Sequence, residues 1–141
     1  MISYCCDGVP MPRIKRRTVS KWIRAVAKRY NRQVGEVAYM FVSEERILEI
    51  NRTYLQHDYF TDIITFDYDS MDVINGDIAI STDTVKSNAS MLGRPYGEEL
   101  HRVIIHGILH LCGINDKLPG EREAMEAAEN EALGMLKGMI E

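Results

Sequence analysis

The sequence contains little cysteine and no long apolar run, and these absences exclude several classes of protein. Its three cysteines are the adjacent pair Cys5 and Cys6 and the distant Cys112, which fit neither a disulfide framework nor a CxxC redox pair. The longest apolar run covers residues 37–42, far fewer than the roughly 20 that a membrane span requires. The first residues also lack the basic and apolar regions of a secretory signal. We therefore expect a cytoplasmic protein that does not associate with a membrane.

The composition excludes disorder and indicates an ordinary globular protein. Of the 141 residues, 45% are hydrophobic and 27% are charged, which is typical of a soluble domain with its own core. A chain of this length buries roughly two thirds of the surface that its unfolded form exposes. The sequence has no internal repeat, low-complexity tract or linker, so residues 1–141 are expected to form one domain.

Acidic residues are missing from residues 8–35, although the chain as a whole is acidic. The net charge is −4, from 17 basic and 21 acidic residues. Nine basic residues lie in this segment, which leaves eight bases against 21 acids, a net charge of −13, elsewhere. Because binding follows the local field, the segment is a candidate RNA-binding surface, although a solvated helix face would show the same charges. The predicted RNA contacts are Arg13, Lys15, Arg16, Arg17, Lys21, Arg24 and Lys28.

Hydrophobic periodicity predicts an α+β fold with about four strands and about five helices. Strands are expected at residues 2–6, 37–42, 63–68 and 76–81. Helices are expected at 20–31, from 44 onward with Ser43 as the cap, at 82–91, at 98–112, and from 120 or 121 onward.

The last of these helices is expected to have one apolar and one acidic side. Its inward side is predicted to carry Met125, Ala128, Ala132, Met135, Leu136 and Met139. Its solvated side is predicted to carry Glu121, Glu123, Glu126, Glu129 and Glu131.

Two histidines lie four residues apart in the strongly apolar helix predicted at 98–112. His106 and His110 therefore share one face, and buried imidazoles need hydrogen-bond partners or a metal ion. Gly113 can end the helix in a left-handed turn, which lets Asp116 return a carboxylate to the same place. Two imidazoles and one carboxylate leave an open coordination position, as catalytic zinc sites do. We predict a metal site at His106, His110 and Asp116; two hydrogen-bonded core histidines are the alternative.

The most suitable ion for this donor set is Zn²⁺, although the same donors also bind Fe(II). Cys112 points away from the histidine face and is predicted to be a core residue. Metallopeptidases with an HExxH helix carry their general base directly after the first histidine. This chain has Gly107 there, which disfavours a peptidase.

Residues 106–116 resemble the signature of the YbeY family, HGxLHLxGYDH. Residues 50–66 are similar to the family's LNxxYR…D…TDVLSF segment, and residues 76–81 to its GDIxIS strand. The resemblance covers roughly residues 36–135. It implies a single-domain α+β fold with a small mixed sheet, a zincin-like metal helix, and zinc ligands at His106, His110 and, by register, Asp116. It also implies a single-strand-specific endoribonuclease that acts in ribosomal RNA maturation, at the 16S rRNA 3′ end, and in ribosome quality control.

Two positions depart from the family pattern. Asp116 replaces the third histidine, which changes the charge of the ligand set. Leu55 replaces an arginine implicated in contacting RNA, and a leucine cannot make a charge-assisted phosphate contact. His57 is a candidate catalytic substitute, with a solvated loop histidine as the alternative. Tyr59 and Phe60 are expected either to stack on bases or to belong to the core.

The leading hypothesis is a metal-dependent hydrolase, an endonuclease that cleaves RNA phosphodiester bonds. Its expected partners are single-stranded RNA, ribosomal RNA precursor, and the ribosome or small-subunit proteins. The sequence leaves open whether water or the ribose 2′-hydroxyl is the nucleophile, and it identifies no general base. Two alternatives remain: a ribosome-associated factor with a structural metal and little catalysis, and a minimal metallopeptidase.

Overall fold

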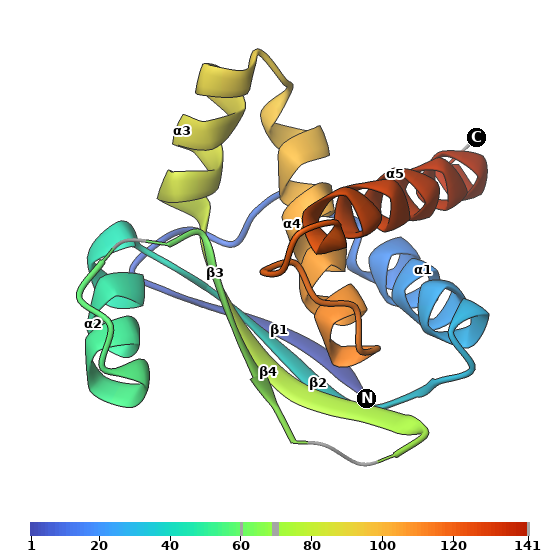
Figure 1. Ribbon diagram of the computed structural model, residues 1–141. Coiled ribbons are helices and arrows are strands. Elements are labelled where there is room, and N and C mark those ends of the chain that lie inside the picture. Colours follow the sequence, from blue (N-terminus) through green and yellow to red (C-terminus); the bar gives the residue numbers. More distant parts are fainter. Residues whose placement is uncertain (60, 69–70, 141) are drawn as a thin grey trace.

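Strands and helices follow one another in the first half of the chain, and three consecutive helices close it; with a mixed sheet, this order confirms the predicted α+β fold class. The computed structural model describes residues 1–59, 61–68 and 71–140 (Figure 1). Its elements are β1 (Ile2–Asp7), α1 (Arg16–Arg29), β2 (Gln33–Val42), α2 (Glu44–Leu55), β3 (Ile63–Asp67), β4 (Val73–Ser81), α3 (Thr82–Leu92), α4 (Tyr96–Leu111) and α5 (Glu121–Ile140). None of the helices in the described ranges is both long and apolar enough to cross a bilayer.

The four strands form one mixed sheet in the order β1-β2-β4-β3. β1, β2 and β4 run parallel, and β3 pairs antiparallel with β4. The mixed sheet implied by the family resemblance is therefore confirmed. β3 is an edge strand of this sheet, and its successive side chains point to alternate faces, as in any strand.

The two faces of the sheet are covered unequally. α1, α4 and α5 pack on one face, where the larger core lies, and α2 packs on the other (Figure 1). Buried polar atoms join the layers of the larger core: Trp22 Nε1 donates to the carbonyl of Ala132 at 2.7 Å, and the Tyr39 hydroxyl donates to the carbonyl of Ile104 at 2.8 Å. These bonds satisfy donors that would otherwise be costly to bury, and they fix α4 and α5 against the sheet and α1.

Several elements begin earlier than the sequence pattern predicts. α1 starts at Arg16 instead of residue 20, because the buried Val19 extends its apolar face by a turn. β2 and β4 start at Gln33 and Val73 instead of residues 37 and 76, because these first residues pair with each other ahead of a register shift. The exact ends of such elements depend on tertiary pairing, which a local pattern does not contain.

One other expectation changes near the end of the chain. Met139, in the last turn of α5, was expected to face inward but is exposed and lies outside the core cluster.

Candidate metal centre

The helix that carries both histidines lies very close to the sheet. A Cβ atom at Gly107 would lie 2.9 Å from Cδ1 of Ile78 on β4 and 3.3 Å from Cδ1 of Ile63 on β3. A larger side chain at this position would require Ile78 to shift, and with glycine there this chain lacks the general base of an HExxH peptidase. On the neighbouring face, the rings of His106 and His110 meet edge to face, with their centroids 4.6 Å apart.

The end of α4 returns the chain to this face. Gly113 has a φ of +97°, the left-handed conformation that glycine adopts readily. Its N–H donates to the carbonyl of His110, and the N–H of Ile114 donates to that of Leu109, the two bonds of a Schellman motif. Sequence alone predicted this stop, and it directs the following loop back toward the histidines.

The structure brings the three predicted ligands together. Oδ2 of Asp116 lies 3.4 Å from Nε2 of His106 and 3.5 Å from Nε2 of His110. One ligand atom from each residue lies within 4.8 Å of the other two. Two imidazoles and a carboxylate at this spacing could hold a metal ion.

Glu129 of α5 is a partner of this site that the sequence analysis placed wrongly in solvent. Its Oε2 lies 2.6 Å from Nδ1 of His106, and its Oε1 accepts from Nη1 of Arg102 at 3.0 Å. Glu129 is only 8% exposed. Its ion pair with Arg102 and its hydrogen bond with His106 offset the cost of burying the carboxylate. Its spacing from the buried Met125 and Ala132 matches the inward face of α5, so the apolar pattern contained the signal that its charge obscured.

The two histidines differ in their affinity for protons. Burial alone lowers the pKa of His106, but the hydrogen bond and charge of Glu129, with Asp116 and Asp62, outweigh burial and raise it. Burial and the neighbouring His106 lower the pKa of His110. A site without metal therefore favours a proton on His106 and a neutral His110.

Asp62 is a second residue of the site that sequence reasoning missed. It precedes β3 and lines a cavity of about 490 Å³ together with His106, His110 and Asp116. Burial raises its pKa, although His106 lowers it in part. No lysine or arginine within the described part of the chain forms an ion pair with it. Its position directly before a strand that resembles TDVLSF was the available signal.

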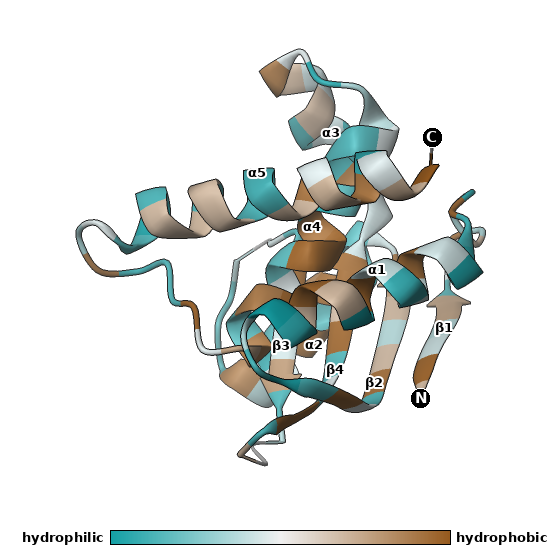
Figure 2. Ribbon diagram, turned by 90° about the vertical axis from the view of Figure 1, so that its right-hand side faces the viewer, coloured by the Kyte–Doolittle hydropathy of each residue, from teal (hydrophilic) through white to brown (hydrophobic). Residues whose placement is uncertain are grey.

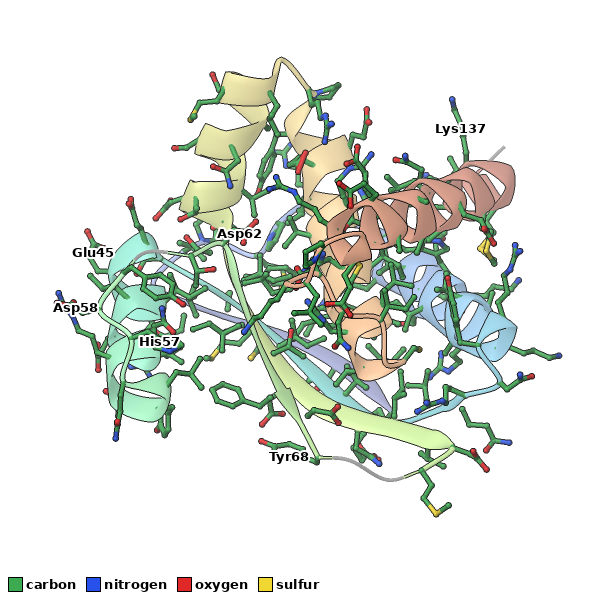
Figure 3. The ribbon with its side chains drawn as sticks, in the orientation of Figure 1. Glu45, His57, Asp58, Asp62, Tyr68 and Lys137 are labelled. Atoms are coloured by element: carbon green, nitrogen blue, oxygen red, sulfur yellow. The ribbon has the colours of Figure 1, made fainter. Side chains whose placement is uncertain are left out.

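His57 is not brought to this site. It is exposed, its Nδ1 lies 3.0 Å from the hydroxyl of Tyr59, and the two rings stack. Figure 3 shows it beside α2, whereas Asp62 lies at the end of β3 that is close to the start of α3. Leu55 and Tyr59 are exposed, and Phe60 lies outside the described residues. Within the described ranges, none of these side chains lines a cavity that contains His106.

The basic segment is also separate from the metal centre. All seven predicted RNA contacts are exposed, on α1 or just before it. α1 faces the viewer in Figure 2, where hydrophilic and hydrophobic residues alternate along its ribbon. Among the residues that the structure describes, none of these seven lines any of the cavities beside His106. Their role as RNA contacts stays a prediction.

Known proteins resemble this chain over almost its whole length. The family model described as Endoribonuclease YbeY matches residues 10–137. Proteins with that name are 64% identical over 136 residues in Phocaeicola vulgatus (96% of this chain, 99% of the relative) and 61% identical over 134 residues in Bacteroides thetaiotaomicron (95% and 98%). The solution structure of TM1509 from Thermotoga maritima is 26% identical, covers 98% of this chain and 93% of its own, and superposes with a TM-score of 0.66. The chain therefore belongs to the endoribonuclease YbeY family.

Proposed function

We propose that this chain is a cytoplasmic, metal-dependent endoribonuclease that cleaves single-stranded ribosomal RNA precursor, with residues 1–141 as one catalytic domain. The observation that carries the proposal is the convergence of His106, His110 and Asp116 on one point, in a chain whose relatives are named endoribonucleases. By the family resemblance, the substrate is the precursor of 16S rRNA, and the ribosome or its small-subunit proteins are partners.

The donor set fits zinc. Two imidazole nitrogens and one carboxylate oxygen are the ligands of many catalytic zinc sites, and Glu129 occupies Nδ1 of His106, which leaves Nε2 to face Asp116. A divalent ion held here would polarise a phosphoryl oxygen or lower the pKa of a water molecule. Asp116 adds negative charge that a third histidine would not, so we expect weaker acidification than in relatives with three histidines.

The protein groups around the ligands have separate tasks. Glu129 accepts the Nδ1 proton of His106 and so fixes the tautomer and the ring orientation. Arg102 holds the other oxygen of Glu129. Asp62 places a carboxylate in the same cavity as the three ligands, where it can accept a proton from the attacking hydroxyl group.

RNA is favoured over peptide as the substrate. Gly107 packs against Ile78 where a peptidase would carry its base, which argues against the metallopeptidase alternative. The cations on and before α1 can raise the local concentration of RNA through their field. Replacing Lys21, Arg24 and Lys28 together by alanine is expected to weaken RNA binding and flatten its salt dependence, without changing the bound metal.

The test is cleavage of a single-stranded ribosomal RNA fragment by purified protein. His110→Ala and Asp116→Ala are each expected to lose both bound metal and cleavage, and the matched control His57→Ala is expected to keep both. Cleavage at the wild-type rate by both ligand variants would contradict the proposal. The alternative of a structural metal, motivated by Leu55 and Asp116, predicts instead that chelation lowers the melting temperature while wild-type protein binds RNA and never cleaves it.

A further inference from the structure

A second cavity adjoins the metal centre on the side away from β3. It has a volume of about 400 Å³ and lies between the α3–α4 turn, α4 and α5. His106 and Asp116 form part of its wall, so it opens directly onto the candidate metal ligands. A strand of RNA with one phosphate at the metal centre would have a neighbouring nucleotide within reach of this cavity.

Arginines from separate parts of the fold line this cavity. Arg94 comes from the turn before α4 and Arg122 from the first turn of α5. Arg94 makes one ion pair, at 3.4 Å to Glu99, which leaves most of its N–H groups available. Arg122 is exposed and forms no ion pair within the described residues, not even with Glu126 one turn later. Guanidinium groups bind phosphate oxygens with two parallel hydrogen bonds.

The cavity on the β3 side offers fewer cations. Its charged residues besides Asp116 are Asp62, Asp67 and Lys117. The arginine-lined cavity also contains glutamates, of which Glu99 is paired with Arg94 and Glu129 with Arg102. Because Arg122 is the lining arginine that has no ion pair among the described residues, it is the group that most favours this side for the RNA backbone.

We propose that this cavity is a subsite for the phosphate next to the scissile one, bound by Arg122 and Arg94. The proposal rests on the proposed function, since it assigns the path of the same RNA substrate. Leu92, which is 57% exposed on the cavity wall, offers an apolar surface to the ribose or base of that nucleotide. The subsite supplies cations close to the metal centre, which the segment around α1 does not.

Binding of a five-nucleotide single-stranded RNA with 2′-O-methyl riboses tests the subsite, with fluorescence anisotropy as the readout. Arg122→Ala is expected to weaken binding about tenfold, and to reduce the slope of log affinity against log salt by about 0.7. Arg94→Ala is expected to act in the same direction. Glu126→Ala, which removes an unpaired negative charge from the same wall, is expected to tighten binding.

Lys137→Ala is the matched control, since Lys137 lies near the far end of α5 (Figure 3) and lines no part of this cavity. It is expected to bind like wild type. Arg122→Ala, Glu126→Ala and Lys137→Ala are expected to keep wild-type metal content and melting temperature, whereas Arg94→Ala removes the partner of the buried Glu99 and is expected to lower the melting temperature. Wild-type affinity in both arginine variants, or an equal loss in Lys137→Ala, would overturn the subsite.

A cleavage assay separates this proposal from the proposed function. Wild-type protein is expected to cleave a dinucleotide that carries an additional terminal phosphate with a lower KM than the same dinucleotide without it, and Arg122→Ala is expected to lose this difference. If wild type cleaves RNA but Arg122→Ala keeps the preference, the subsite is wrong and the function stands. If wild type binds RNA through Arg122 but never cleaves it, the cavity binds an RNA phosphate but is no subsite of a cleavage reaction, and the proposed function is wrong.

Discussion

Nδ1 of His106 lies 2.6 Å from Oε2 of Glu129, a residue 23 positions further along the chain. This contact joins the metal-binding face of α4 to the first half of α5. Because Arg102 binds the second oxygen of the same carboxylate, Glu129 is held from two sides. The imidazole is thus oriented before any ion binds, with Nε2 toward Asp116.

Replacing Glu129 should weaken metal binding without removing a ligand. Loss of such an outer partner typically costs 10–100-fold in metal affinity, so Glu129→Ala should lower zinc affinity by about that factor. Glu129→Gln, whose amide oxygen can still accept from Nδ1, should lose less. Competition with a chromophoric chelator measures both, and Glu123→Ala on the solvated side of α5 is the control. Unchanged zinc affinity in Glu129→Ala would show that the contact does not orient His106.

Gly76 allows β4 to pack closely against β3 and the end of α4, so a larger residue there should destabilise the fold. An added Cβ would lie 2.6 Å from the backbone carbonyl oxygen of Phe66 on β3 and 3.0 Å from Leu111 at the end of α4. Gly76→Ala should therefore destabilise the fold by about 1–3 kcal/mol, as measured by chemical denaturation. Gly134→Ala on α5 meets nothing within 4 Å, and should stabilise by about 0.5–1 kcal/mol through helix propensity. Equal effects of the two substitutions would contradict this packing.

Cys112 should be unreactive in the folded protein. Burial raises the pKa of its thiol to about 11, with Arg32 opposing in part, so the reactive thiolate is scarce near neutral pH. Cys5 and Cys6 are exposed. Treatment with iodoacetamide at pH 8 followed by mass spectrometry should find modification at Cys5 and Cys6 alone, and at all three after unfolding. Because the pKa of the Cys112 thiol is higher in the folded chain than in the unfolded chain, the free energy of unfolding should fall as the pH rises from about 9 to about 11.

Asp62→Asn should reduce RNA cleavage while leaving metal and RNA binding intact. The substitution keeps the size of the side chain but removes the carboxylate that can accept a proton in the metal cavity. A general base typically contributes 10²–10⁴-fold, so kcat should fall by about 10²-fold or more with KM little changed. Single-turnover cleavage of a labelled RNA measures this. A wild-type kcat in Asp62→Asn would exclude Asp62 as the base.

The convergence of the ligands was predictable because it depends on local geometry. Histidines four residues apart share a helix face, and Gly113 ends that helix in a way that returns Asp116 to it. The contribution of Glu129 was also encoded, in its spacing from Met125, but its charge was taken as evidence of exposure. A buried carboxylate becomes predictable only when its partner is known, and that partner is on another helix.

The relation between the basic segment and the metal centre could not be predicted. A run of cations fixes the charge of a surface but not its position relative to a site some 70 residues away. That position depends on how α1 packs beside α5, a tertiary contact with no signature in either segment. For the same reason the cavity formed by Arg94 and Arg122, from two separate elements, became visible only in the folded chain.

The metal-dependent cleavage of RNA is tested most directly by measuring bound metal and RNA cleavage in the same sample, purified without added metal. We expect about one zinc ion per chain, cleavage of single-stranded ribosomal RNA precursor that stops on chelation and returns with zinc, and loss of both metal and cleavage in Asp116→Ala. Full cleavage by metal-free protein, or by an Asp116→Ala sample that holds no metal, would contradict metal-dependent cleavage.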